Sequence, residues 1–547
     1  MESRIIHAVP ARPEPALTQA LITVEGASRI REDFPFMLSD ESRMPGGTAD
    51  RILFPSGEFQ ISEILRELND QNSAVTVSGG RTGIVGGAVP QGGSVLTMEK
   101  CSRFTGARWD EDQKAWCVRV EPGMTVGALG EILKDGRVLE AAEPSGKPGL
   151  RFQHRPERWI YPVDPTESTA QIGGTVATNA SGSRSLRFGP TRTHVSGLRV
   201  VLMDGSVLDL QRGQAVSDKG LPFRVEKNGR ITEIPAPSYP WPTVKNAAGY
   251  CSRLPLDLLD LFIGSEGTLG VVSEIELKLS PKPEAVFGGI AFFQSESDAV
   301  RFVHAVQKDS GVHPLALEFF DAHGLHLLSG RPIQGQEPDR PDWPAFPDSS
   351  KAAVFFEQAF RPDGLDACLT RYGRILDECG GSMDDTWGAS DDRELEKMAE
   401  FRHALPEIVN SMIGSRKQKH PGIHKISTDF AVPESRFDEM LGFYRSTLDA
   451  AGLEYLIFGH IGESHVHINI LPDDEQELFH AKLLVQDLAR KAVSLGGTIS
   501  AEHGIGKLKK DYLSLQFSKK SLESMRNVKK ALDPRCLLGR ETLIKAF

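Results

Sequence analysis

The stretch SGGRTGIVGG at residues 78–87 holds five glycines and follows AVTV (74–77), whose residues predict a short strand. Glycine permits positive φ and lets a backbone come close to an anion, so the loop suits either an ordinary turn or a phosphate site. It does not match GxGxxG, because Arg81 and Thr82 stand where that pattern needs glycine, and it lacks the Gly-Lys-Ser/Thr ending of a P-loop. Taken alone, this loop leaves both interpretations open.

Two further segments of small residues follow the glycine loop. One is DPTESTAQIGGTVATNASGSRSLRFGPTRTHVSGL (164–198), which has few charges to solvate it. The other combines KNAAGY (245–250) with FIGSEGTLGVVSEI (262–275). Because each of the three leads to a strand and offers backbone to a close neighbour, together they predict one large ligand that lies across a domain.

Length and composition are those of an ordinary globular chain: 547 residues, 39% hydrophobic and 25% charged. At about 150 residues per domain, this length suggests three or four units. The net charge of −11 and the lack of a long basic run argue against a nucleic-acid partner. No apolar stretch reaches the roughly 18 residues of a membrane span, and the N-terminal segment lacks the apolar core of a signal peptide. The six cysteines are scattered without a CxxC, which predicts reduced thiols in a cytoplasmic protein and no iron–sulfur site.

Hydrophobic spacing gives a coarse element order. Helices are predicted at 56–71, 392–413, 475–496 and 519–532, the last closed by Asp533-Pro534. Strands are predicted at 74–80, 423–433 and 455–470, and 289–307 is expected to be a strand followed by a helix.

Three other segments carry specific expectations. VSGLRVVLMDGSVLDL (195–210) predicts a hairpin with a primed turn at Asp204-Gly205. SEIELKLSP (273–281) alternates apolar and charged residues, which predicts a strand with one face in water. The Pro-, Asp- and Gly-rich segment 329–350 is expected to be a surface insertion.

The run GHIGESHVHINI (459–470) places three histidines within eight residues, and ISAEHGIGK (499–507) adds Glu502 and His503. VHINI alternates, so His465, His467 and Asn469 share one face of a strand, with His460 in the preceding turn. These groups suit a metal site, a catalytic site, or a polar strand face with hydrogen-bonded histidines. The residues by themselves leave the three interpretations open.

The order of these segments, from the glycine loop through KNAAGY to SAEHGIGK, resembles the FAD-linked oxidase family with the vanillyl-alcohol-oxidase-type, or PCMH-type, flavin fold. Within it the chain is most similar to the branch of D-lactate, glycolate and D-2-hydroxyglutarate dehydrogenases. The resemblance runs from about residue 55 to the C-terminus and implies an α+β architecture. It implies an N-terminal extension (1–54), a two-subdomain FAD-binding domain (55–282), a cap domain with an antiparallel sheet, helices and the metal site (283–515), and a C-terminal helical segment that returns to the FAD domain (516–547).

The resemblance also implies how FAD is bound. The first loop would hold the pyrophosphate through backbone N–H groups, the second segment would line the flavin and its ribityl chain, and the third would add further contacts. Carried over by position, these residues are Ser78, Gly79, Gly80, Arg81, Thr82 and Gly83; Pro165, Thr166, Gly173, Gly174, Ala177, Asn179, Ala180, Gly182 and the turn 187–191 with Thr191; and Glu266, Gly267, Gly270 and Ile275. Relatives with covalent flavin often carry His where this chain has Arg81, so non-covalent FAD is expected, with Arg81 either neutralising a phosphate or lying in solvent.

Metal-dependent relatives carry GHxGDGNxHxN followed by EHG, and by position the ligands of a divalent zinc or manganese ion become His460, His467 and Glu502. The chain departs from this pattern, because the Asp-Gly-Asn of the family is here Glu463-Ser464-His465. His465 is therefore an extra ligand, a substrate contact or a filler.

By the same resemblance, a 2-hydroxy acid would lose a hydride from C2 to the flavin N5 and a proton from its hydroxyl to His503 as general base. The metal would bind the hydroxyl and carboxylate oxygens and lower the hydroxyl pKa. Asn469 would hydrogen-bond the substrate, and Arg402 would pair with its carboxylate. Lys425 is a weaker candidate, because its alignment to the family's lysine slips.

Three other functions remain open from the sequence: a flavin oxidase that uses oxygen, a redox-neutral transferase resembling alkylglycerone-phosphate synthase, and a flavoprotein subunit that needs partner chains. Such transferases carry a histidine cluster where this chain has SAEHGIG, which disfavours the second. With no cysteine cluster, electrons would leave to a separate quinone, cytochrome, electron-transfer flavoprotein or iron–sulfur subunit. The expected location is the cytoplasm or the inner face of the membrane. The substrate and the oligomeric state, a homodimer being one option, are left open.

Overall fold

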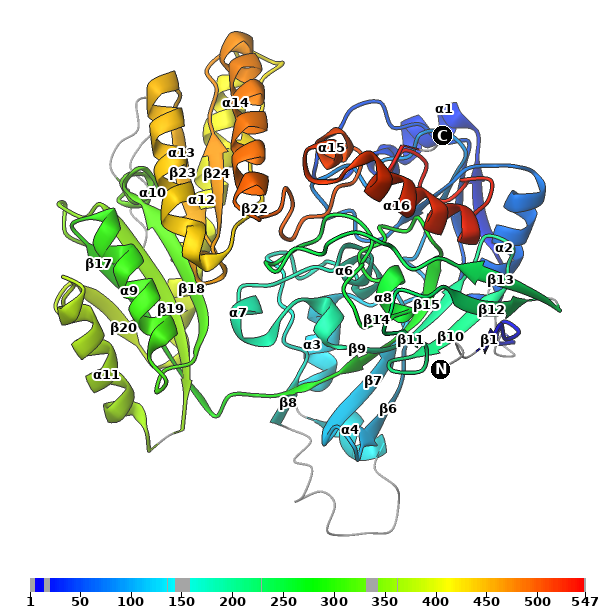
Figure 1. The fold of residues 1–547 in the computed structure, drawn as a ribbon, viewed down its shortest axis with the longest axis horizontal. Coiled ribbons are helices and arrows are strands. Elements are labelled where there is room, and N and C mark those ends of the chain that lie inside the picture. The colour runs from blue at the N-terminus through cyan, green and yellow to red at the C-terminus, as the bar shows by residue number, and fades with distance from the viewer. Residues whose placement is uncertain are drawn as a thin grey trace.

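The computed structural model describes residues 5–13, 20–134, 136–142, 158–227, 229–330, 343–361 and 363–545. It is an α+β protein with two lobes, between which the chain crosses twice (Figure 1). In the part of the chain that the structure describes, no helix is long and apolar enough to cross a membrane.

The first lobe begins with a four-stranded sheet in the order β2 (Ile22–Glu25), β3 (Arg51–Phe54), β5 (Ser94–Thr97) and β4 (Val75–Ser78). The last three strands are parallel. α2 (Glu58–Asp70) confirms the helix predicted at 56–71, and its apolar face is buried against this sheet. Short helical segments α1 (Ala27–Asp33) and η1 (Pro35–Leu38) precede β3. Because β2 and β3 belong to the sheet, it starts before the proposed boundary at residue 54.

The second sheet of this lobe is antiparallel, in the order β10 (Val207–Gln211), β9 (Val195–Val201), β15 (Val271–Lys278), β7 (Ala115–Val120) and β6 (Phe104–Asp110). Helices α3 (Val126–Leu133) and α6 (Ile172–Thr178) share its core. The smaller elements of the lobe are β1 (Ile5–His7), α4 (Arg137–Ala142), β8 (Trp159–Ile160), α7 (Ser185–Phe188), η3 (Thr191–Thr193), β11 (Val216–Ser217), β12 (Phe223–Lys227), β13 (Arg230–Ile234), β14 (Leu256–Asp257), α8 (Leu259–Phe262) and β16 (Ser280–Pro281).

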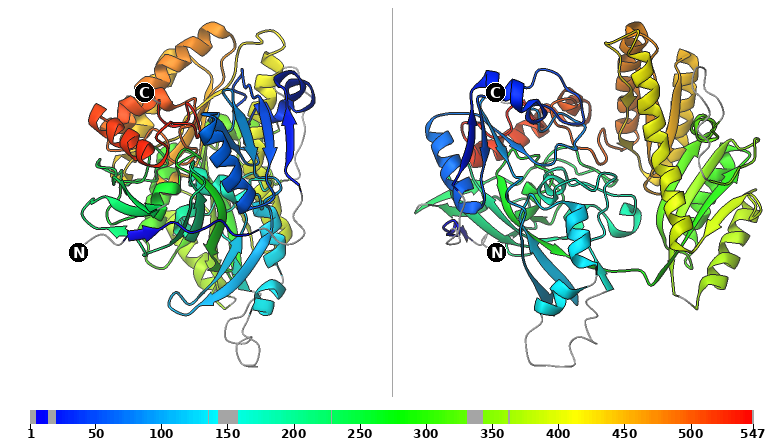
Figure 2. Two further views of the ribbon diagram at one scale, coloured as in Figure 1. Left: turned by 90° about the vertical axis from the view of Figure 1, so that its right-hand side faces the viewer. Right: turned by 180° about the vertical axis from the view of Figure 1, so that it is seen from behind.

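The second lobe, the cap, is built on one antiparallel sheet, as predicted. Its order is β20 (Thr386–Ala389), β17 (Ala285–Phe293), β19 (Ala352–Phe360), β18 (Pro314–Asp321), β23 (Tyr455–Gly459), β24 (His465–Ile470) and β21 (Ile426–Ser427), with β22 (Phe430–Ala431) also on β24. One face is covered by α9 (Glu296–Lys308), α11 (Leu365–Glu378), α13 (Phe437–Ala451) and α14 (Glu475–Ser494), and the other by α10 (Ala322–Leu328) and α12 (Asp392–Arg416). Figure 2 shows these helices flanking the sheet from behind. The turns η4 (Glu434–Arg436) and η5 (Ile461–Glu463) complete the cap.

The chain returns to the first lobe after α14, through η6 (Lys510–Tyr512), α15 (Leu513–Gln516) and α16 (Lys519–Leu532). The buried ammonium of Lys529 on α16 donates hydrogen bonds to the carbonyls of Thr268 and Leu538, 2.5 and 2.8 Å away. The tail also pairs with β4, where the Val75 N–H donates to the Leu537 carbonyl at 2.8 Å. These bonds confirm that the C-terminal helix packs on the first lobe.

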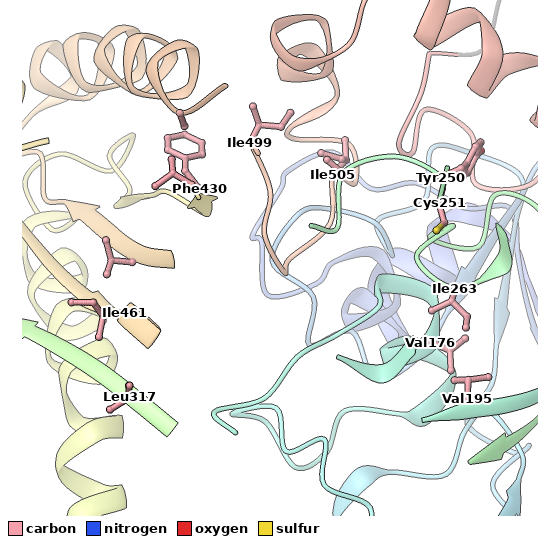
Figure 3. Packing of buried hydrophobic residues seen from close by; sticks show 14 of the residues in the cluster. Val176, Val195, Tyr250, Cys251, Ile263, Leu317, Phe430, Ile461, Ile499 and Ile505 are labelled. Carbon is pink, nitrogen blue, oxygen red and sulfur yellow. The ribbon is translucent and has the colours of Figure 1, made fainter. Parts of the chain in front are cut away.

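Figure 3 shows the apolar side chains on either side of the gap between the lobes. Leu317, Phe430 and Ile461 lie on the cap, while Val176 and Ile263 lie on the first lobe. Ile499 and Ile505 lie on the segment that crosses back between them, and both are buried. The crossing segment that carries Glu502 and His503 is therefore anchored by apolar packing at each end.

Two expectations are wrong in detail. The hairpin β9–β10 forms, but of Asp204 and Gly205 only Gly205 has positive φ, at 80°, so the turn is not primed. The Gly205 N–H donates to the Leu202 carbonyl at 2.9 Å, and the Leu202 N–H bonds Ser206 O at 2.8 Å, which is a three-residue loop with glycine in the left-handed position.

The strand predicted at 273–281 has no wet face. It is the central strand β15, and its carboxylates Glu274 and Glu276 are 8% and 6% exposed. Arg12 and Arg108 pair with them, each at 2.6 Å, and cover that face of the sheet. The charges that suggested solvent are neutralised by arginines from elsewhere in the chain. Of the predicted insertion 329–350, residues 331–342 lie outside the described residues.

Candidate active site and metal centre

A cavity of about 520 Å³ runs from the glycine loop in the first lobe to the histidine cluster of the cap. Its size is within the range of about 300–1,000 Å³ typical of small-molecule and cofactor sites. Most of the residues predicted to bind the cofactor line it: Gly79, Gly80, Arg81, Thr82, Gly83, Pro165, Thr166, Gly173, Gly174, Ala177, Ala180, Gly182, Glu266, Gly267 and Gly270. The three segments that lie up to about 190 residues apart in sequence thus form one wall, as the sequence predicted.

Four predicted cofactor residues are absent from the described lining of the cavity: Ser78, Asn179, Thr191 and Ile275. Asn179 ends α6 in the left-handed conformation, and its side-chain oxygen accepts a bond from the Arg192 N–H at 3.0 Å. The Thr191 hydroxyl donates to the Ala180 carbonyl at 2.8 Å. Ser78 and Ile275 are fully buried. Asn179 and Thr191 therefore brace the wall from behind, and the turn 187–191 also lies off the described lining.

Arg81 lines the cavity, but its guanidinium is already engaged. Nη2 lies 2.9 Å from Glu99 Oε1, and the guanidinium carbon lies 5.4 Å from the centre of the Phe36 ring. The backbone at Arg81 has a φ of 60°, so this non-glycine residue is held in the left-handed region. Arg81 thus has two structural roles: its backbone forms a left-handed turn in the loop, and its side chain contacts Glu99 and Phe36.

The histidine cluster converges on one carboxylate. His460 follows β23, His465 and His467 share one face of β24 as predicted, and Glu502 and His503 lie on the crossing segment. Glu502 Oε1 lies 3.4 Å from Nε2 of His460, 3.3 Å from Nε2 of His467 and 3.5 Å from Nε2 of His503. Nδ1 of His465 lies 4.0 Å from the other oxygen, Oε2. Four imidazoles therefore present one ring nitrogen each to Glu502.

The outer nitrogens of the two predicted metal ligands each face an acceptor. Nδ1 of His460 lies 2.9 Å from Glu318 Oε1, and Nδ1 of His467 lies 3.1 Å from the Thr428 carbonyl. Such outer partners fix the tautomer and the ring orientation of metal-binding histidines, leaving the inner nitrogen free to act as a ligand. Glu318 was missed from the sequence; the only signal was a carboxylate within the apolar run PLALEFF (314–320).

Asp429 organises the other half of the cluster. It lies 3.1 Å from Nε2 of His465 and 3.3 Å from Nδ1 of His503. It also accepts bonds from the backbone N–H groups of Glu502 and His503, at 3.2 and 3.1 Å, and from Lys509 Nζ at 2.8 Å. Asp429 thereby holds the crossing segment against β24. It lies in the segment 423–433 that was predicted as a strand, where no role was assigned to it.

Lys245 is the third site residue, after Glu318 and Asp429, whose role the sequence did not reveal. Its side chain is 6% exposed, and Nζ lies 2.7 Å from Glu502 Oε2 and 2.9 Å from Glu463 Oε2. Nζ also donates to the Ser185 hydroxyl at 3.1 Å, and that hydroxyl donates to Glu463. Lys245 and Ser185 come from the first lobe, Glu463 from the cap and Glu502 from the crossing segment, so these buried ion pairs join the lobes. Its signal was the lysine that opens the small-residue run KNAAGY.

Burial and neighbouring charge act in opposite directions on the cluster. Burial alone would raise the pKa of the Glu502 carboxyl, but Lys245 and His460 hold it well below its usual range. Burial alone would lower the pKa of His460, but Glu318 and Glu502 raise it to about 10. For His465 burial prevails over the attraction of Glu502 and lowers the pKa to about 4. His465 is therefore a neutral imidazole, whereas His460 would release a proton if a metal ion bound.

The remaining predicted residues lie on the same cavity. Asn469 is 2% exposed, lines the cavity, and its Oδ1 has no hydrogen-bond partner among the described residues. Arg402, on α12, lines it as well, with Nη1 3.4 Å from Glu318 Oε1. Lys425 also lines the cavity, and burial, followed by the charge of Arg43, lowers its pKa. The guanidinium of Arg402, the ammonium of Lys425 and the amide of Asn469 thus line the same cavity as residues of the histidine cluster.

Glu266 lines the cavity and binds the segment that carries Glu502 and His503. Its carboxylate accepts bonds from the backbone N–H groups of Ile505 and Gly506, at 2.8 and 2.7 Å. Burial raises its pKa to about 7 in spite of these bonds. Glu266 was predicted as a cofactor residue, and it also holds the crossing segment two residues beyond His503.

The donor set suits a divalent metal ion. Ligand atoms of His460, His465, His467 and Glu502 all lie within 4.8 Å of one another, as do those of Asp429, His467, Glu502 and His503. In a tetrahedral site with bonds of about 2.0 Å, donor atoms lie roughly 3.3 Å apart, close to the His460–Glu502 and His467–Glu502 distances. The side chains present therefore fit a zinc-like ion with a small inward movement.

Family comparison covers most of the chain. Residues 49–150 and 150–211 match a family described as FAD binding domain, and residues 282–542 match FAD linked oxidases, C-terminal domain.

Individual relatives match over nearly the whole chain. The chain is 26% identical over 495 residues to D-lactate dehydrogenase [cytochrome] 1, mitochondrial, from Saccharomyces cerevisiae. The match covers 90% of this chain and 72% of the yeast protein. It is 26% identical over 538 residues to D-2-hydroxyglutarate dehydrogenase from Stutzerimonas stutzeri, covering 96% and 98%. Among solved structures, an alkyldihydroxyacetonephosphate synthase matches with a TM-score of 0.55 at 16% identity, covering 90% and 77%, which shows a shared fold.

Proposed function

Because the chain belongs to the family of FAD-linked oxidases, and is an FAD-dependent oxidoreductase, we propose that it oxidises a D-2-hydroxy acid to the 2-oxo acid. The observation that carries this proposal is the single cavity that joins the glycine-lined wall to the histidine cluster, Arg402 and Asn469. The names of the relatives favour D-lactate or D-2-hydroxyglutarate as the substrate, and glycolate stays among the candidates.

FAD is proposed to lie along the glycine-lined wall and to be bound without a covalent link. Bound FAD supplies the oxidant, because it accepts two electrons and a proton equivalent from the substrate. The loop that would hold its pyrophosphate contains no histidine, and Arg81 is held by Glu99. Acid precipitation of the protein is therefore expected to release all of its flavin into the supernatant.

Gly174 offers a direct test of the position of FAD. It lines the cavity, and no described heavy atom outside its own helix lies within 4 Å of a Cβ built at this position. Gly174→Leu should therefore fold, because its side chain enters open space, but should lose at least about nine-tenths of its flavin, because that space is the proposed cofactor site. The flavin-to-protein absorbance ratio measures this.

The matched control is Gly130→Leu. Gly130 lies on α3, is exposed, and likewise has no described neighbour within 4 Å of a built Cβ. Leucine is a better helix former than glycine, so both variants should melt no lower than the parent apoprotein. Full flavin content in Gly174→Leu would place FAD elsewhere.

The chain's own residues suggest how the substrate would be held and deprotonated. The planar guanidinium of Arg402 suits bidentate pairing with the substrate carboxylate. The amide of Asn469, whose Oδ1 has no partner among the described residues, would hydrogen-bond the substrate. His503, held at Nδ1 by Asp429, lines the cavity and would take the hydroxyl proton at Nε2, which lies 3.5 Å from Glu502 Oε1.

A divalent ion is proposed as the second cofactor. His460, His467 and Glu502 would hold it, and it would supply positive charge that favours the deprotonated substrate hydroxyl. Glu318 and Thr428 would keep the two imidazoles in place. Zinc and manganese are the candidates.

Anaerobic mixing tests the reaction. The purified flavoprotein is mixed with D- and L-lactate, glycolate, D-malate and D-2-hydroxyglutarate, with and without a chelator, while the flavin absorbance is followed. Rapid bleaching by one of the D-acids or glycolate, slowed by the chelator and restored by zinc or manganese, is the expected result. If no hydroxy acid bleaches bound FAD, the proposal is wrong and the redox-neutral transferase gains weight.

The electron acceptor is proposed to be a separate carrier. The yeast relative is named for a cytochrome, and a quinone, an electron-transfer flavoprotein or an iron–sulfur subunit would serve equally in chemical terms. The reduced protein is expected to reoxidise slowly in air. Rapid release of hydrogen peroxide would identify an oxidase instead.

A further inference from the structure

His465 is the residue at which this chain departs most from the metal-dependent pattern, and its surroundings are unusual. It is 0% exposed, and while its Nε2 lies 3.1 Å from Asp429 Oδ1, its Nδ1 has no hydrogen-bond partner among the described residues. A buried polar group without a partner is unfavourable, so a position that retains one calls for a ligand or a structural reason.

The ring of His465 is oriented like those of the predicted ligands. Its Nε2 side faces Asp429 Oδ1 at 3.1 Å, and its Nδ1 side faces Glu502 at 4.0 Å. Each of the three cluster imidazoles on β24 and the preceding turn thus has an acceptor behind it and Glu502 in front of it. The centres of the His465 and His467 rings lie 4.7 Å apart, so one ion can reach both.

His503 is a weaker candidate for the same position. Its side chain is 27% exposed and lies on the crossing segment rather than on the sheet. His503 lines the cavity, whereas His465, on β24, is fully buried and is not among the residues that line the cavity. The two imidazoles therefore suit different tasks.

We propose that His465 is an additional metal ligand, so that three imidazoles and one carboxylate hold the ion and favour zinc over manganese. Imidazole nitrogen suits zinc and related ions, whereas carboxylate, carbonyl and water oxygen suit manganese. The metal-dependent pattern that the chain resembles has an asparagine at this position, and His465 offers an imidazole nitrogen in its place. The inference rests on the metal-assisted form of the proposed function.

The test measures coordination directly. The protein is stripped with a chelator and reloaded with one equivalent of zinc, and zinc K-edge X-ray absorption counts the imidazoles. Three are expected in the parent and two in His465→Asn, while His503→Asn should keep three. Competition with a chromophoric chelator should show zinc affinity falling by about tenfold or more in His465→Asn, with manganese affinity changing less.

His194→Asn is the matched control. His194 is also buried, at 2% exposure, with an Nδ1 that lacks a described partner, but it lies in the first lobe away from the cluster. Its replacement should leave zinc affinity unchanged. The imidazole count of the parent protein does not depend on any variant folding, so it tests the proposal even if His465→Asn is unstable.

Two outcomes would overturn the inference: one leaves the proposed metal and oxidation in place, and the other also removes the metal. Two imidazoles in the parent, or unchanged coordination in His465→Asn, would remove His465 from the site and leave the proposed oxidation intact. A parent protein that binds no zinc would reject the inference together with the metal. Bleaching of the flavin by a hydroxy acid in that metal-free protein would then show that the oxidation itself stands.

Discussion

Replacement of His503 by asparagine is expected to lower the rate of flavin reduction by the substrate about 10²- to 10⁴-fold, the usual contribution of a general base. Nδ1 of His503 lies 3.3 Å from Asp429 Oδ2, which holds the ring, and the side chain lines the cavity. Asparagine keeps a polar side chain there but cannot take up a proton. Anaerobic stopped-flow measurement of flavin bleaching at saturating substrate gives the rate.

The pH profile separates a base from a residue that only shapes the cavity. A base works only when unprotonated, so the parent rate should fall on the acid side of the profile, and the variant should lack that limb. His480→Asn, which changes an exposed histidine on α14, is the control and should behave like the parent. A loss of less than about tenfold in His503→Asn, with the acid limb retained, would assign the proton to another group.

Lys245→Met is expected to lower the free energy of unfolding by about 3–5 kcal/mol, because it leaves Glu463 and Glu502 buried without their cation. Burial alone would lower the pKa of Lys245, but these two carboxylates outweigh it and raise the pKa above its ordinary value. For a lobe of this size the loss corresponds to a fall in melting temperature of at least about 6 °C. Differential scanning calorimetry of the metal-free flavoprotein measures it.

Lys114→Met is the matched control for burial. Its ammonium lies 2.9 Å from Glu111 Oε2, a distance similar to those at Lys245, but the two side chains are 73% and 70% exposed. Exposed pairs contribute about 0–1 kcal/mol, so little change is expected. Adding Glu463→Gln to Lys245→Met should recover part of the lost stability, because one unpaired charge is removed. If Lys245→Met melts like Lys114→Met, the buried pair does not stabilise the contact between the lobes.

The sequence predicted those elements whose signals are local. The helices α2, α14 and α16 were placed to within about two residues, because their apolar spacing and end signals lie within the segments themselves. The alternation of VHINI likewise placed His465 and His467 on one face of β24. Ordered small-residue segments were enough to predict the α+β fold and FAD through the family resemblance.

The same local logic failed where distant side chains changed the environment. Glu274 and Glu276 suggested water, but Arg12 and Arg108 bury them. The turn after β9 looked primed from Asp204-Gly205, yet the loop takes one more residue and only Gly205 has positive φ. Arg12 and Arg108 lie more than 160 residues before these carboxylates, so the sequence spacing could not have indicated the ion pairs.

By itself, the sequence determined the fold class, the cofactor and the identity of the histidine cluster, because these rest on residue types in a fixed order. Only the tertiary structure decided which groups surround Glu502. Lys245, Glu318 and Asp429 are separated from it by about 260, 180 and 70 residues, yet their oxygens and nitrogens define its charge and orientation. Electrostatic interaction depends on distance in space and on burial, and both are set when the two lobes close on one cavity.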